Sequence, residues 1–256
     1  MIEIFELEYT KAQLAKVPDE ERTFFLVMTS LANDVQMLNK QMQTSIREES
    51  DIKVVQHGAH AMAMLNLRML AGRLYEGWKT HKEHYPKISD IYDKELKPNA
   101  KSALTDLENY FSPKQAEGQP KPSRALLAMV RDKIGFHADF KMTAAAFDEC
   151  KDDAIMGEYL CKTMGNTLYF STEMVHLEVV AKIEKSSSED AASLMALMDH
   201  TRDVTSLFNT FVFGFSAIFL RRHFPKKIKK LARKRVVLPS QPKLRDLRFS
   251  FFTELE

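Results

Sequence analysis

Glycine and cysteine are scarce in this sequence of 256 residues, which contains eight glycines and two cysteines. The sequence has no Gly-rich phosphate-binding loop, so it gives no support for nucleotide hydrolysis. Two cysteines are too few for a disulfide framework, and we therefore expect a reducing, cytoplasmic location. Neither Cys150 nor Cys161 belongs to a Cys-x-x-Cys pair, so we expect both side chains to be buried and unreactive.

A long uninterrupted apolar run is also missing. The segment 207–220, LFNTFVFGFSAIFL, is interrupted by Asn209, Thr210, Gly214 and Ser216, and it is shorter than the ~18–20 apolar residues that span a bilayer. The N-terminal MIEIFELEYTK is acidic and short of apolar residues, unlike a signal peptide. We therefore expect a core helix over 207–220 and do not expect a membrane partner.

Histidine motifs typical of metal sites are incomplete. His57–His60 and His81–His84 are His-x-x-His pairs, but zinc needs three or four ligands and no Cys or acidic residue stands at ligand spacing. We expect these to be surface or hinge histidines. Glu173–His176 is a Glu-x-x-His, of which di-iron helical bundles need two, and no second one is present. The sequence predicts neither a metal ion nor another cofactor.

What the sequence does contain is helix-forming residues in helical patterns. Fourteen methionines and few glycines favour helix over sheet. Apolar residues from Phe24 to Met42 recur every three or four positions, which predicts one long helix from Pro18 to about Ser45. A second long helix is expected over 50–85, and a third from Ser188 to about Phe224. Shorter helices are expected over 100–111, 124–140, 142–149, 153–164 and 173–184.

These elements predict an all-α bundle with two long N-terminal helices and one long C-terminal helix. We expect residues 1–224 to form a single helical domain, and 225–256 to form a basic segment and an extended C-terminal arm. The last long helix is apolar on more than one side, which is typical of a helix that lies at the centre of a bundle or is shared with a second subunit. We therefore expect a homodimer.

Positive charge is concentrated in one segment. Residues 221–235, RRHFPKKIKKLARKR, contain nine Lys or Arg and no acid, although the net charge of the whole chain is only +2. Such a segment favours nucleic-acid phosphates, with binding that weakens steeply with salt. The alternatives are an anionic membrane surface and a solvated helix end. The expected nucleic-acid-binding residues are Arg221, Arg222, Lys226, Lys227, Lys229, Lys230, Arg233, Lys234 and Arg235.

The segment 129–140, MVRDKIGFHADF, holds residues that could cleave RNA. A histidine such as His137 can take a proton from a 2′-hydroxyl or give one to a leaving oxygen, and Arg131 can clamp a phosphate and stabilise its developing charge. Asp132 could orient either partner. On a straight helix, residues six apart lie ~9 Å apart along the axis and ~120° apart around it. A two-fold-related copy, or a kink at Gly135, would bring Arg131 and His137 together.

The same residues resemble a known family. Arg131-Asp132-(x4)-His137 fits the R-x(4–6)-H signature of the HEPN superfamily, and the context "LENYF…RALLAMVRDKIGFHADF" looks like HEPN-like proteins of bacterial abortive-infection and toxin–antitoxin systems. The resemblance covers about residues 100–140. It implies an all-helical domain that dimerises across the motif and, in active members, a metal-independent ribonuclease with a neutralising protein partner. Arg131 and His137 match the catalytic pair, and Asp132 replaces the more frequent Asn.

A second interpretation stays open. The chain can be a non-catalytic helical interaction module or dimer in which Arg131, Asp132 and His137 are structural, because HEPN-like folds also include non-catalytic members. Its basic C-terminal segment would then serve nucleic acid or an anionic membrane surface.

Overall fold

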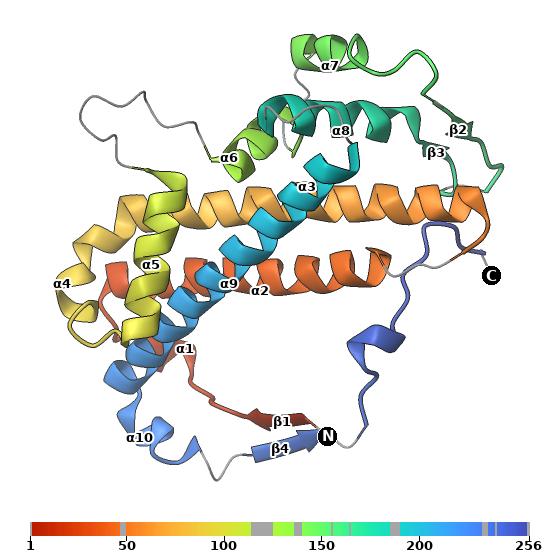
Figure 1. Cartoon of the computed structure of the whole chain (residues 1–256). Helices are drawn as coiled ribbons and strands as arrows, with labels where there is room; N and C mark the ends of the chain where they lie inside the picture. The colour runs from red at the N-terminus through yellow and green to blue at the C-terminus, as the bar shows by residue number, and fades with distance from the viewer. Residues whose placement is uncertain are drawn as a thin grey trace, which may run out of the picture.

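The computed structural model describes residues 2–46, 50–113, 125–135, 140–154, 156–163, 165–184, 190–231, 235–238 and 240–254. This part of the chain is an all-α bundle built on three long helices, α2 (Asp19–Ile46), α3 (Lys53–His84) and α9 (Asp190–His223) (Figure 1). The predicted fold class, with two long N-terminal helices and a long C-terminal helix, is confirmed.

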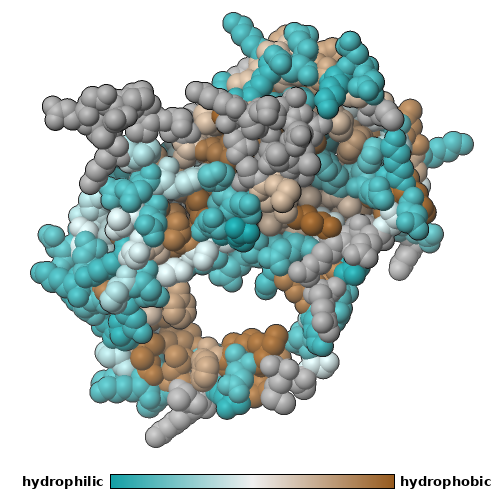
Figure 2. Space-filling view, in the orientation of Figure 1, coloured by the Kyte–Doolittle hydropathy of each residue, from teal (hydrophilic) through white to brown (hydrophobic). Residues whose placement is uncertain are grey.

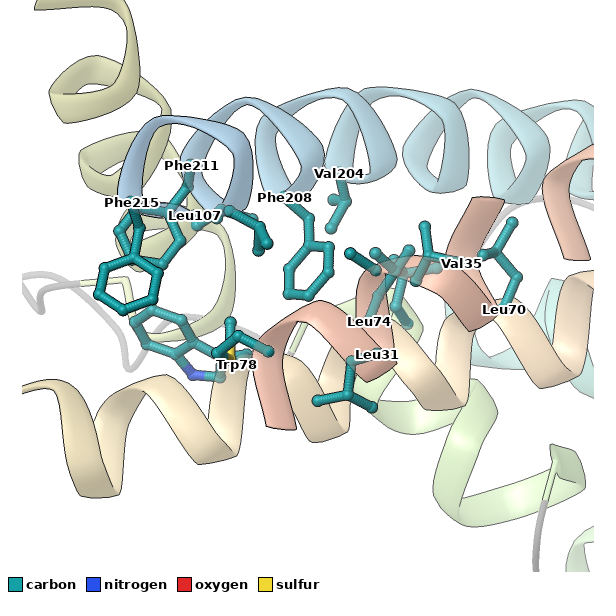
Figure 3. Close-up of a cluster of buried hydrophobic side chains, with 14 of the residues drawn as sticks. Leu31, Val35, Leu70, Leu74, Trp78, Leu107, Val204, Phe208, Phe211 and Phe215 are labelled. Atoms are coloured by element: carbon teal, nitrogen blue, oxygen red, sulfur yellow. The ribbon is translucent and has the colours of Figure 1, made fainter. Parts of the chain in front are cut away.

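One apolar core joins the three long helices. The predicted stripe of α2 is buried, from Phe24 and Met28 to Val35 and Met42, because side chains spaced by three and four share one helical face. Helix α9 crosses α2 and α3 and places its phenylalanines between them (Figure 3). The cluster drawn there includes Leu31 and Val35 of α2, Leu70, Leu74 and Trp78 of α3, Leu107 of α5 (Pro98–Phe111), and Val204, Phe208, Phe211 and Phe215 of α9.

Close approach of α9 to α3 depends on Gly77. The Phe208 ring lies directly over this residue, and a Cβ atom built on Gly77 would collide with the ring carbons. The absence of a side chain at Gly77 therefore lets an aromatic ring of α9 lie directly on the backbone of α3.

The ends of α2 and α9 are joined by a buried carboxylate. Tyr92 donates its hydroxyl hydrogen bond to Oε2 of Glu21 at 2.6 Å, and His223 Nε2 lies 2.9 Å from the same oxygen. Glu21 is buried in the first turn of α2, where a negative charge suits the positive end of the helix. The contact fixes the C-terminal end of α9, and with it the start of the basic segment.

Shorter helices surround this frame: α1 (Lys11–Leu14), α4 (Ser89–Tyr92), α5 (Pro98–Phe111), α6 (Leu126–Val130), α7 (Phe140–Phe147), α8 (Ser171–Glu184) and α10 (Pro225–Ile228). Two 3₁₀ turns are formed by Tyr85–Lys87 and Leu244–Asp246. Helix α8 lies beside α3, α7 packs on α8, and α5 packs on α9 (Figure 1).

Two short antiparallel strand pairs complete the described structure. Strand β1 (Ile2–Phe5) pairs with β4 (Arg235–Leu238), with Ile2 opposite Leu238 and Phe5 opposite Arg235. This ribbon lies apart from the bundle, and an opening separates the two in the space-filling view (Figure 2). Residues 240–254 then return to the bundle as an arm, where Asn166 Nδ2 donates to the carbonyl of Thr253 at 2.6 Å.

The helix predicted over 153–164 is wrong. Glu158–Tyr159 (β2) instead pairs with Leu168–Tyr169 (β3) in a hairpin that contains Gly165 with φ +86°. The pairing is favoured because it buries Leu168 and Phe170 beneath the hairpin. The prediction of two buried cysteines is also wrong, since Cys161 in this hairpin is exposed and Cys150 is only half-buried.

Within the described residues, the segment Leu197–His223 of α9 is long and apolar enough to cross a bilayer by length and composition. Phe208, Phe211, Phe215 and Phe219 of this segment are buried in the core of the bundle. The same apolar pattern is therefore used for packing here.

Candidate functional site

The motif arginine stands on a π-helical turn. Helix α6 ends at Val130, and Arg131–Gly135 continue as a π turn rather than as the predicted straight helix. A Cβ atom at Gly135 would lie 3.4 Å from the carbonyl oxygen of Arg68, so the turn rests closely on the backbone of α3. π turns inside helices are frequent at functional sites.

Two carboxylates hold the guanidinium of Arg131. Its Nη2 donates to Glu76 Oε1 at 2.8 Å and its Nη1 donates to Asp132 Oδ1 at 2.7 Å. The hydrogen bond to Asp132, with the charges of Asp132 and Glu76, outweighs the opposing effect of burial and raises the pKa of Arg131. Lys79 lies 3.5 Å from the other oxygen of Glu76. Glu76 therefore contacts two cations, Arg131 and Lys79.

The structure brings together part of the predicted constellation. Arg131 and Asp132 are in contact, and Glu76 of α3 joins them. Sequence reasoning missed Glu76, because nothing local to its position on α3 points to a partner on the π turn after α6. His137 lies outside the described residues, so the distance between Arg131 and His137 is not defined.

A second, more buried charge cluster lies between α3 and α8. Arg68 Nη1 lies 2.5 Å from His176 Nδ1, and Arg68 Nη2 donates to Glu173 Oε1 at 3.4 Å. His176 Nδ1 also lies 3.6 Å from Glu173 Oε2. Burial favours the neutral form of Glu173, but the hydrogen bond from His176 and the charge of Arg68 prevail and lower the pKa of Glu173.

His57 and His60 border this cluster, contrary to the prediction of surface or hinge histidines. The His57 ring stacks on Phe170 at 3.7 Å and its Nδ1 lies 2.8 Å from the Tyr159 hydroxyl. Burial lowers the pKa of both His57 and His60. Nothing local in the sequence connects these histidines with Glu173 and His176. Arg68, on the mostly apolar side of α3, contacts both Glu173 and His176. No group of three or more His, Cys, Asp or Glu in the described ranges could hold a metal ion.

The basic segment surrounds the C-terminal end of α9. Arg222 pairs with Glu95 at 3.8 Å, Lys227 contacts the carbonyl of Glu8, and Arg235 pairs with Glu3. Arg233 and Lys234 lie outside the described residues. The remaining predicted cations, which are exposed and form no ion pair within the described part of the chain, are Arg221, Lys226, Lys229 and Lys230.

An open groove of about 1030 Å³ runs along α9 to these cations. Its floor comes from α9 between Asn209 and Arg221 and from α2 between Thr29 and Gln36, and α10 closes one end with Ile228. Lys97 and Asn99, at the start of α5, form part of the rim.

Comparison with family models, with curated proteins and with solved structures finds no match to this chain. The site must therefore be interpreted from its own residues.

Proposed function

We propose that this protein is a HEPN-like RNA-binding protein that cleaves RNA without a metal ion, with Arg131 and His137 as its reactive pair. The observation that carries the proposal is the attachment of the Arg131 guanidinium to Glu76 and Asp132 on the π turn. A guanidinium fixed in this way loses little side-chain freedom when it binds a phosphate. The sequence places His137 two residues after this turn.

In the proposed reaction His137 takes the proton of an RNA 2′-hydroxyl. The 2′-oxygen then attacks the adjacent phosphorus, the bond to the 5′-oxygen breaks, and a proton passes to that leaving oxygen. The products are a 2′,3′-cyclic phosphate and a 5′-hydroxyl. Arg131 stabilises the charge on the phosphoryl oxygens, and Asp132 orients Arg131. A two-fold-related copy would supply a second Arg131 and His137 to a shared cleft, so the proposal includes a homodimer.

The exposed cations at the end of α9 support the binding part of the proposal. Arg221, Lys226, Lys229 and Lys230 can contact phosphates without first breaking an ion pair to another described residue. The resemblance to HEPN-like proteins of toxin–antitoxin systems implies that a cytoplasmic ribonuclease of this kind would be kept inactive by a neutralising protein.

The test is cleavage of a labelled mixed-sequence RNA in EDTA by the wild type, Arg131→Ala and His137→Ala. We expect the wild type to cut and both variants to be slower by ~10²-fold or more, as is typical for loss of an acid–base group. Arg73→Ala is the matched control, because Arg73 of α3 is likewise an arginine paired with a carboxylate of another helix, Asp34 of α2 at 3.2 Å. Intact RNA with the wild type, or equal cutting by all four proteins, contradicts the proposal.

The non-catalytic interpretation is favoured by one observation. The two carboxylates that fix Arg131 also compete with a phosphate for its guanidinium. Binding of RNA that is salt-sensitive but never leads to cleavage would establish this second candidate.

A further inference from the structure

The groove along α9 is lined largely by apolar residues, and hydrogen-bonding side chains stand among them. Asn33 and Gln36 of α2 and Asn99 of α5 line it and are exposed. Their carboxamides form no hydrogen bond to other described side chains or backbone groups. On α9, the residues Asn209 and Ser216 also line the groove. Their atoms Asn209 Oδ1 and Ser216 Oγ are buried and have no hydrogen-bond partner in the described residues.

The exposed carboxamides of Asn33, Gln36 and Asn99 are the groups that a ligand in the groove can reach. Carboxamides present a donor and an acceptor side by side, which is the arrangement that recognises the edge of an unpaired base. A hydrocarbon chain offers neither group, and burying these three exposed carboxamides against lipid would be costly.

An exposed aromatic ring lies within the same groove. Phe213 has 78% of its surface exposed, and it stands on the opposite side of α9 from Phe208 and Phe215, which are buried in the core. An exposed phenylalanine beside carboxamides can stack on a nucleic-acid base. Such stacking does not depend on which base is present, because every base has an aromatic face.

Cations complete the groove. Arg221 and Lys97 line it, and Ile228, which closes one end, is flanked by Lys227 and Lys229. Glu95 also lines it, and its carboxylate is offset by Arg222. Proteins bind single-stranded nucleic acid by combining an aromatic ring that stacks on bases with cations that contact the phosphates. This groove has both, together with carboxamides that can contact base edges.

We propose that this groove, between Asn209 and Arg221 on α9, binds single-stranded RNA through its unpaired bases. This proposal rests on the proposed function because it takes RNA as the ligand. The surface that would recognise the RNA is the groove, which is separate from the π turn that carries Arg131. The helical rise from Asn209 to Arg221, twelve residues further along α9, is ~18 Å. This is the length of about five stacked nucleotides at ~3.4 Å each. The groove therefore takes a short unpaired stretch, and a duplex, whose base edges are already paired, fits it poorly.

The experiment measures fluorescence anisotropy of a 5′-labelled eight-nucleotide RNA of mixed sequence, in EDTA. All proteins carry His137→Ala, so that the proposed cleavage cannot destroy the probe. Phe213→Ala should weaken binding roughly 5- to 100-fold, the range expected for loss of one stacked base. Phe213→Tyr, which keeps a stacking ring, should bind like the parent. The matched control is Phe249→Ala, since Phe249 is 54% exposed on the C-terminal arm.

Charge and strandedness are tested with the same probe. Lys229→Gln combined with Lys230→Gln should reduce the slope of log affinity against log salt by about 1.4, at ~0.7 for each lost phosphate contact on a single strand. The same sequence annealed to its complement should bind more weakly than the single strand.

The outcomes separate the two proposals. If RNA binds but Phe213→Ala changes nothing, or the duplex binds equally well, the groove assignment is overturned while the proposed function survives. If no RNA binds, both are overturned. Binding of phosphatidylglycerol vesicles through Phe213 in place of RNA would also overturn the assignment and would identify the groove as a membrane-contacting surface.

Discussion

Arg131 and Glu76 lie 55 positions apart in the sequence, and their side chains form an ion pair of 2.8 Å. The pair joins the π turn after α6 to α3, so the motif arginine is supported by one of the two longest described helices. Its geometry is therefore set by the bundle and not only by the residues next to it in the motif.

Replacing Glu76 should separate a positioning role from a purely structural one. We expect Glu76→Ala to slow RNA cleavage by at least tenfold, because Arg131 loses the partner that orients it, while the free energy of unfolding falls by only about 1 kcal/mol for a partly exposed pair. Single-turnover cleavage and urea unfolding measure the two effects. Glu76→Gln, which keeps a hydrogen-bond acceptor, should recover most of the cleavage rate. A variant that unfolds more easily but cuts at the normal rate would contradict the positioning role.

Gly77→Ala tests the contact between α3 and α9. Alanine normally stabilises a helix interior relative to glycine by up to ~1 kcal/mol, but here its methyl group meets the Phe208 ring. We expect a net loss of about 1–3 kcal/mol from overpacking. Gly157→Ala is the control, because nothing lies within 4 Å of a Cβ built there, and it should change stability little. Stabilisation by Gly77→Ala would contradict the packing described for Phe208.

His81 should make the fold sensitive to acid. Its ring stacks on Tyr85 at 4.7 Å and meets Phe211 edge-on at 5.1 Å, and burial lowers its pKa to about 4. A pKa lowered by folding means that the unfolded chain binds the proton more tightly, so stability is fully present above about pH 6.5 and is lost as pH falls toward 4. The loss between pH 7 and pH 5 should be roughly 2 kcal/mol. Urea unfolding at both pH values should show a smaller loss in His81→Gln. An equal loss in the two proteins would contradict this role of His81.

Breaking the ion pair between Arg68 and Glu173 should lower the free energy of unfolding far more than breaking a surface pair. Both side chains are nearly buried, at 11% and 10% exposure, so Glu173→Gln would leave Arg68 charged and poorly compensated, with an expected loss of about 3 kcal/mol. The matched control is Asp199→Asn, which breaks an exposed pair with Arg202 at 2.8 Å and should change stability by less than ~1 kcal/mol. Because the pKa of Glu173 is lowered, its stabilising contribution is present above the carboxyl pKa of the unfolded chain and is lost as pH falls. Similar losses for the two variants would contradict the importance given to burial.

The long helices could be predicted because their information is local. The spacing of Phe24, Met28 and Val35 fixes which side of α2 is buried, whatever that side packs against. The β1–β4 ribbon could not be predicted, because it joins Ile2–Phe5 to Arg235–Leu238 near opposite ends of the chain. The hairpin at 158–169 was missed for a related reason, since its pairing depends on burying Phe170 against His57 of α3.

The candidate site shows the same division. Arg131 and Asp132 could be selected from the motif, and the cations of 221–235 from their density. Glu76 and Arg68 could not, because each becomes significant only through a partner on another helix. Phe213 belonged to a run that predicted a core helix, and only the packing of α9 shows that this one ring faces outward.

The central claim is most directly tested by the chemistry of the RNA ends. Labelled RNA incubated with the wild-type protein in EDTA should yield fragments that end in a 2′,3′-cyclic phosphate, and His137→Ala should yield none. RNA that stays intact with the wild type, or fragments whose ends and amounts are the same for both proteins, would contradict the account of Arg131 and His137 as a reactive pair.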